Sequence, residues 1–143
     1  MQDKKQISIF VPLKRVGDNL VVYLQKRSAD NKTLPNYFGF WGGHRENDET
    51  PEETLLREIT EEMGIIIDLK YVELFNQYEF VRSIKSIYLF WSEEGWDDSI
   101  VIGEGDYGIW FSIEEGMATE NIILEDKVVL NDLERVLLKK PIR

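Results

Sequence analysis

Three glutamates gather near the end of a predicted helix, within the stretch REITEEMG at residues 57–64. Glu58, Glu61 and Glu62 are three and four residues apart, so at about 100° per residue they project as one stripe along the helix. Carboxylates at these spacings repel one another, and the end of a helix carries partial negative charge of its own. The stripe therefore predicts a positive partner close by, and a divalent cation is the most compact one.

Other metal-binding residue types are nearly absent from the chain. It has no cysteine and a single histidine, His44, which excludes thiolate sites and sites built from several histidines. Any metal ion must therefore be held by oxygen atoms, which suit hard cations such as Mg²⁺, with Mn²⁺ a common substitute. From the acids alone, a solvated helix face without metal is an equally good interpretation.

One amphipathic helix positions the three acids. Thr50 is its predicted N-cap, Pro51 fits the first helical position, and Glu53 can complete a capping box with Thr50. Gly64 ends the helix as a C-terminal cap. Its apolar face consists of residues at helical spacing, namely Leu55, Leu56, Ile59 and Met63. The acids are therefore expected at the edge of the core.

Residues before and within this helix follow one fixed spacing. From Gly43 to Ile65 the chain matches G-x5-E-x7-R-E-U-x-E-E-x-G-U, where U is a bulky aliphatic residue. The nine specified positions are Gly43, Glu49, Arg57, Glu58, Ile59, Glu61, Glu62, Gly64 and Ile65. This pattern is the signature of the Nudix (MutT-like) hydrolases, and the sequence resembles that family at every fixed position over 23 residues.

The resemblance implies Mg²⁺- or Mn²⁺-dependent hydrolysis of a diphosphate linked to another group, usually a nucleoside diphosphate derivative. By the family pattern, Glu61 and Glu62 are metal ligands, and Glu58 is a metal ligand or the base that acts on water. Arg57 orients these carboxylates by ion pairing, and the Gly42 carbonyl can add a neutral metal ligand. A metal ion suits this reaction because it screens the phosphate charge and lowers the pKa of bound water.

Further candidates lie outside the matched segment. Glu104 lies where many relatives place another acid, as metal ligand or base, and Asp106 is the alternative; both could also belong to an ordinary acidic turn. Arg27 ends a predicted strand where the family often has an arginine facing the substrate phosphates. His44 is a candidate phosphate contact. Phe38 is a candidate for stacking on a nucleobase, although a loop aromatic is more often a packing residue.

Departures from the family pattern bear on the substrate. Trp41 stands before the paired glycines where many relatives have proline, which affects loop shape and substrate preference more than catalysis. Pro141 is the only proline beyond the matched segment, which disfavours the ADP-ribose subgroup. Tyr78 does not fit the tyrosine position of dinucleoside polyphosphate enzymes convincingly. Nucleoside triphosphates and sugar nucleotides remain the two expected substrate classes.

The order of elements predicts an α/β fold in one domain spanning residues 1–143. Strands are predicted at residues 6–15, 19–27, 71–80 and 83–91 and from residue 107, with a short one near 38–41 in a long loop. A last helix is predicted at about residues 125–139, with Val129, Leu133, Val136 and Leu137 on its apolar face. These elements predict a mixed sheet between helices, and the resemblance implies the α/β/α sandwich of the family.

Charge and composition limit the classes of partner. The 143 residues include 27 acidic and 17 basic ones, a net charge of −10. This charge disfavours binding to long nucleic acids but allows a small phosphate ligand with its own cations. No segment has the pattern of a membrane span or a signal peptide, so we expect a cytoplasmic protein without membrane contact. Whether the protein is a homodimer, as many relatives are, is open.

Three functional interpretations differ in how well they explain the acids. An active Nudix pyrophosphohydrolase acting on a small nucleotide explains why the acid set is unbroken. A Nudix-like sensor that binds a nucleotide without hydrolysis has less need for that set, and the chain offers no room for a DNA-binding domain. A structural domain whose acids merely solvate the helix is disfavoured by the complete pattern.

Overall fold

The computed structural model describes residues 3–138. Within them, seven strands form one sheet in the order β3-β2-β1-β6-β5, with β4 paired to β1 and β7 paired to β2. The strands are β1 (Lys5–Val16), β2 (Asn19–Lys26), β3 (Phe38–Gly39), β4 (Trp41–His44), β5 (Val72–Glu79), β6 (Ser83–Trp91) and β7 (Tyr107–Ser112). Strands β1 and β6 run parallel and the other pairs are antiparallel. The predicted mixed sheet is therefore confirmed.

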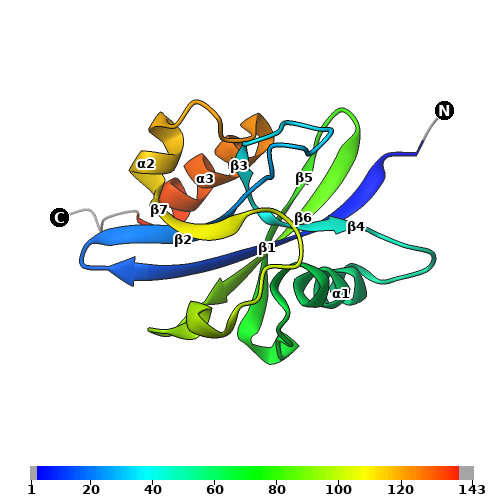
Figure 1. Ribbon diagram of the computed structural model, residues 1–143, viewed down its shortest axis with the longest axis horizontal. Helices are drawn as coiled ribbons and strands as arrows, with labels where there is room; N and C mark the ends of the chain where they lie inside the picture. The colour runs from blue at the N-terminus through cyan, green and yellow to red at the C-terminus, as the bar shows by residue number, and fades with distance from the viewer. Residues whose placement is uncertain (1–2, 139–143) are drawn as a thin grey trace.

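Helices cover both faces of the sheet, with α1 on one side and α2 and α3 on the other (Figure 1). The helices are α1 (Pro51–Met63), α2 (Ile113–Ala118) and α3 (Leu124–Leu137), with two short 3₁₀ turns, η1 (Leu69–Tyr71) and η2 (Trp96–Ser99). Alternating residues of β1 contribute to two cores, because Ile9 and Val11 face α3 whereas Phe10 faces α1. This is the α/β/α sandwich implied by the resemblance. Within the described chain, no helix is long and apolar enough to cross a membrane.

Both ends of α1 follow the predicted chemistry. The Thr50 hydroxyl accepts the Glu53 N–H at 3.1 Å, and the Glu53 carboxylate accepts the Thr50 N–H at 2.8 Å, which completes the capping box. Gly64 ends the helix in the left-handed region with a φ of 67°, which glycine adopts without strain. Leu55 and Ile59 are buried in the core on this side of the sheet. The helix that carries the acids is therefore firmly fixed.

Some element boundaries differ from the sequence prediction. The short strand expected near 38–41 is two strands, because the chain pairs with β2 up to Gly39 and with β1 from Trp41 onwards. Strand β2 ends one residue before Arg27, which therefore begins the following loop. The last helix is α3, and its predicted end at Lys139 lies outside the described residues. The break after Gly39 matters for the site, because it sets the direction in which β4 runs toward the end of α1.

The capping box is testable by substitution. Thr50→Ala removes the side-chain acceptor of the Glu53 N–H, so we expect the free energy of unfolding to fall by about 1 kcal/mol. Urea denaturation followed by circular dichroism measures this change. Thr33→Ala, in an exposed loop, is the control and should change stability by less than about 0.5 kcal/mol. Equal effects of the two substitutions would contradict the role of the cap.

Candidate active site

The carboxylate of Glu62 turns away from solvent, toward β4. The residue is only 4% exposed, and its Oε1 accepts the Gly42 N–H at 2.6 Å. Burial raises the pKa of Glu62 to about 9, although the Gly42 N–H opposes this shift. The neighbouring charges that add to the shift are those of Glu58, Glu104 and Glu61. Glu62 thus binds the Gly42 N–H and lies near enough to three further carboxylates to be affected by their charges.

Arg57 is a positive partner of the kind that the acidic stripe predicts. Its Nε lies 2.7 Å from Glu49 Oε2, and its Nη2 donates to the His44 carbonyl at 2.8 Å. Its Nη1 lies 3.0 Å from Glu58 and 3.3 Å from Glu61. These carboxylates, Glu49 foremost, raise the pKa of Arg57. Arg57 therefore connects two acids of α1 to the segment that joins β4 to the helix.

The three acids of α1 differ in their access to solvent. The Glu58 side chain is 13% exposed and that of Glu61 is 47% exposed, whereas Glu62 is buried. A β-carbon at Gly43 would overlap the Glu58 carboxylate, so glycine is what leaves room for this acid over β4. Burial raises the pKa of Glu58, while Arg57 lowers it. The acids are therefore not one evenly solvated stripe.

Glu104 reaches the same place from a distant part of the sequence. The residue before it, Gly103, donates its N–H to the Glu62 carbonyl at 2.8 Å, which ties this segment to the end of α1. The charge of Glu104 accordingly contributes to the raised pKa of Glu62. Asp106, the alternative acid, instead forms an ion pair with Lys26 at 2.5 Å. The geometry favours Glu104 as the member of the acid group.

The arrangement of the acids bears on whether they could hold a metal ion. Within residues 3–138, no group of three or more His, Asp or Glu side chains is close enough together to hold an ion as they stand. Arg57 holds Glu58 and Glu61, and the Gly42 N–H holds Glu62. The donor set still suits a hard divalent cation, because it offers several carboxylate oxygens in a partly buried place with excess negative charge.

Two residues expected to contact the substrate, Arg27 and Phe38, contact other parts of the protein in this structure. Arg27 donates from Nε to the Thr33 carbonyl and from Nη2 to the Asn31 side chain, each at 3.0 Å, and so holds its own loop. Phe38 is half-buried and packs edge-to-face against Phe111, with ring centroids 5.1 Å apart. Both residues therefore help to build the structure around the site.

His44, the third expected substrate contact, lies beside a basic groove. His44 and Lys85 both pair with Ile7 of β1, so their side chains share the face that α3 covers. Burial lowers the pKa of His44, and the charges of Lys5 and Lys85 lower it further. The groove has a volume of about 650 Å³, and basic residues outnumber acidic ones in its lining. The basic ones are Lys4, Lys5, Arg82 and Lys85, and the acidic ones are Asp3 and Glu125. Sequence periodicity could not find this group, because it depends on the parallel pairing of β1 with β6.

Trp41, which stands where many relatives have proline, is wholly buried. Its Nε1 donates to the Tyr23 carbonyl at 3.0 Å, and its ring stacks on that of Tyr23 with centroids 5.6 Å apart. The residue therefore links β4 to β2 through the core that lies under α1. It positions the strand that carries Gly42 and takes no direct part in the acid group.

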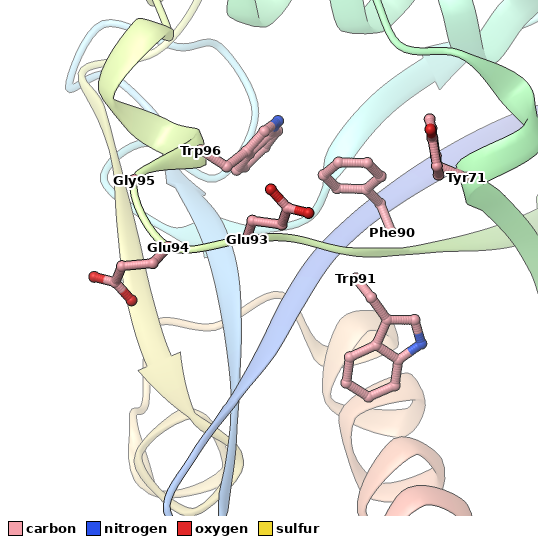
Figure 2. A pocket seen from close by; sticks show the side chains of 7 residues that line it. All are labelled: Tyr71, Phe90, Trp91, Glu93, Glu94, Gly95 and Trp96. Atoms are coloured by element: carbon pink, nitrogen blue, oxygen red, sulfur yellow. The ribbon is translucent and has the colours of Figure 1, made fainter.

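A separate aromatic cavity of about 420 Å³ shares no lining residue with the acid group. Its aromatic lining includes Tyr71, Phe90 and Trp96, and Glu93 contributes a carboxylate. Figure 2 shows the rings of Phe90 and Trp96 on one side of β6 and that of Trp91 on the other. We therefore place the candidate active site at the end of α1 and not in this cavity.

Comparison of the sequence with known proteins gives three matches that agree. The family model described as the NUDIX domain matches residues 4–133. The 8-oxo-dGTP diphosphatase of Escherichia coli (strain K12) is 31% identical over 133 residues, which cover 92% of this chain and 99% of that protein. The 8-oxo-dGTP diphosphatase of Haemophilus influenzae is 30% identical over 109 residues, 76% of this chain and 77% of that protein.

The fold has solved counterparts as well. A MutT/nudix family protein from Enterococcus faecalis superposes with a TM-score of 0.77 at 17% identity, over 97% of this chain and 64% of that longer one. Identity this low shows the shared fold alone. The domain match, which covers most of the chain, and the relative from Escherichia coli carry the assignment further. The chain therefore belongs to the Nudix family of hydrolases.

Proposed function

We propose that the protein is a metal-dependent pyrophosphohydrolase of nucleoside triphosphates, with an oxidised guanine nucleotide such as 8-oxo-dGTP as the first candidate substrate. The observation that carries this proposal is the buried Glu62 carboxylate, crowded by the charges of Glu58, Glu61 and Glu104. The two 8-oxo-dGTP diphosphatases among its relatives support the choice of substrate class. The cytoplasmic location expected from the sequence remains part of the proposal.

The proposed reaction is hydrolysis of a phosphoric anhydride. Water attacks a phosphorus atom, and the bond from that phosphorus to the bridging oxygen breaks. The products are a nucleoside monophosphate and inorganic diphosphate. A carboxylate, Glu58 or Glu104, takes the proton from the water. Arg57 keeps Glu58 and Glu61 in place, as its contacts of 3.0 and 3.3 Å indicate.

The cofactor proposed for this reaction is Mg²⁺ or Mn²⁺. Members of the family generally use divalent metals, and the residues proposed to hold the ion are Glu58, Glu61, Glu62 and Glu104 with the Gly42 carbonyl. The ion would supply positive charge against the phosphate oxygens and make water a stronger nucleophile. The partly buried acid group supports this role, because a compact dication compensates several carboxylates at once.

The nucleotide is proposed to pass the end of β4 at His44, because this residue reaches both sides: its carbonyl accepts from Arg57 next to the acid group, and its side chain lies on the face of the basic groove. The basic groove next to His44 is a place of positive charge in a chain whose net charge is −10. Within residues 3–138, Lys5 and Arg82 form no ion pair within 4.0 Å, so their charges are open to a phosphate-bearing ligand. Arg27 and Phe38 remain proposed contacts for the phosphates and the base, and a homodimer remains part of the proposal.

A substrate screen tests the proposal. The purified protein is incubated with nucleoside triphosphates, 8-oxo-dGTP, sugar nucleotides, ADP-ribose and dinucleoside polyphosphates, with Mg²⁺ or Mn²⁺ and with EDTA. We expect nucleoside triphosphates to yield a nucleoside monophosphate and inorganic diphosphate, and we expect no product in EDTA. Faster cleavage of a sugar nucleotide would overturn the substrate class. Nucleotide binding without any product would favour the non-catalytic sensor.

Metal binding should be visible as a gain in stability. An ion that binds only the folded state, at a concentration a hundred times its Kd, stabilises that state by about 2.7 kcal/mol. For a chain of this size, this gain corresponds to a rise of roughly 10 °C in Tm. Glu62→Gln keeps the shape but removes a carboxyl whose pKa burial raises to about 9. At neutral pH that carboxyl must take up a proton when the metal-free protein folds, so the substitution should raise the metal-free Tm, and it should reduce the shift with Mn²⁺. An unchanged shift in this variant, read by scanning calorimetry, would remove Glu62 from the site.

Turnover should depend on Glu61 as well. Glu61→Gln removes a ligand charge at a half-exposed position, so we expect kcat to fall by on the order of a hundredfold or more while the fold is kept. Glu114→Gln, at an exposed position in α2, is the control and should leave kcat unchanged. Near-normal, metal-dependent turnover of Glu61→Gln in a steady-state assay would show that the metal ligands are misassigned.

The basic groove should affect binding more than chemistry. The double substitution Lys5→Gln with Arg82→Gln removes two charges that attract the nucleotide in ground and transition states alike, so KM should rise roughly fivefold with little change in kcat. Lys70→Gln, in η1, removes one charge outside the groove and serves as the control. A KM that matches the control would exclude the groove from nucleotide binding.

A further inference from the structure

Asp126 is a buried carboxylate on the opposite side of the sheet from the acid group. It lies in the first turn of α3 and is only 4% exposed. Its Oδ2 accepts the Phe40 N–H at 3.0 Å, and its Oδ1 lies 3.7 Å from the Lys85 ammonium. A β-carbon at Gly39 would come within 2.8 Å of Oδ2, so the acid is packed tightly on this segment. A buried acid this closely fitted to one backbone N–H has a defined geometric role.

Phe40 occupies the point where the chain changes partners. Gly39 before it pairs with β2, and Trp41 after it pairs with β1, so Phe40 belongs to neither strand pair. A buried N–H at such a break has no strand to donate to and needs another acceptor. Asp126 supplies that acceptor from α3. The direction in which β4 leaves the break is therefore set partly by this contact.

Two residues after Phe40, the backbone N–H of Gly42 is also bound by a carboxylate. Gly42 donates to Glu62 at 2.6 Å, and Glu62 belongs to α1, on the other face of the sheet (Figure 1). Between the two contacts lies Trp41, fixed by its pairing with Phe10. Two helices on opposite faces thus hold one short segment of backbone through two buried acids. A displacement at Phe40 would be transmitted to Gly42 over two residues.

We propose that Asp126 is a positioning residue for the acid group, because its contact with Phe40 fixes how β4 presents Gly42 to Glu62. This inference rests on the proposed metal-dependent function, and it adds α3 to the elements that shape the metal site. In this role Asp126 acts through the Phe40 N–H and not by direct contact with the ion. An acid that only joined α3 to the sheet would contribute to stability and leave Gly42 unaffected.

Three variants separate these two roles. Asp126→Ala removes the acceptor of the Phe40 N–H. Asp126→Asn keeps the shape and one acceptor oxygen. Glu125→Gln is the matched control, because Glu125 also pairs with Lys85, at 2.8 Å, but makes no hydrogen bond to the segment from Phe40 to Gly42. Circular dichroism selects a temperature at which every variant is folded, so that stability does not enter the comparison.

The first measurement is the amide NMR signal of Gly42 in the metal-free protein. We expect this signal to shift in Asp126→Ala, and to stay close to its wild-type position in Asp126→Asn and Glu125→Gln. An unchanged Gly42 signal in folded Asp126→Ala would overturn the inference. Because no metal is present, this result decides the backbone link even if the proposed hydrolase activity fails.

The second measurement is the Mn²⁺ affinity, read by electron paramagnetic resonance. Residues that orient metal ligands without touching the ion affect affinity by about 10–100-fold, so Asp126→Ala should bind Mn²⁺ at least about tenfold more weakly. Asp126→Asn should recover most of that loss, and Glu125→Gln should bind as the wild type does. Wild-type affinity in Asp126→Ala would contradict a positioning role. If Asp126→Ala does not fold, Asp126→Ser, whose hydroxyl is too short to reach Phe40, carries the same expectations.

Discussion

The buried carboxylate of Glu62 imposes the main electrostatic constraint on this structure. It lies out of water with one backbone N–H as its donor, close enough to Glu58, Glu61 and Glu104 for their charges to raise its pKa. A charge held in this way is unfavourable unless something compensates it. Arg57 contacts Glu58 and Glu61 but not Glu62. The remaining excess of negative charge is what a divalent ion would neutralise.

The rest of the fold keeps these repelling groups together. Helix α1 is capped at both ends and packed into a core, so its acids cannot move apart by fraying. Glycine at position 43 lets Glu58 lie against β4, and glycine at 42 allows a φ of 134° where the strand comes very close to Ser8. The Gly103 N–H ties the loop that carries Glu104 to the same helix end. Packing and backbone contacts thus hold charges that would otherwise separate.

Local chemistry made much of this predictable from the sequence. The capping box of Thr50 and Glu53, the end of α1 at Gly64, the main strands and the family pattern all depend on residues close together in the chain. The burial of Glu62 was not predictable, because helical spacing places it in one stripe with Glu61 and only the position of β4 separates them. Such differences arise from contacts between distant segments.

The same limit applies on the other face of the sheet. Asp126 appears in the sequence as an ordinary acid at the start of a helix, and nothing local indicates that its carboxylate meets the Phe40 N–H. The basic groove beside His44 likewise exists only because β1 and β6 pair in parallel. A large ring fits before the glycines, where many relatives have proline, because Trp41 is wholly buried and its Nε1 donates to the Tyr23 carbonyl.

We propose, as the centre of this interpretation, that the acids at the end of α1 bind a divalent ion that compensates Glu62. Diffraction from a crystal soaked in Mn²⁺, recorded at a wavelength where manganese scatters anomalously, tests this most directly. We expect an anomalous peak within coordination distance of Glu62 and at least one of Glu58, Glu61 and Glu104. A fully soaked crystal with no peak there, or with its strongest peak elsewhere, would contradict it.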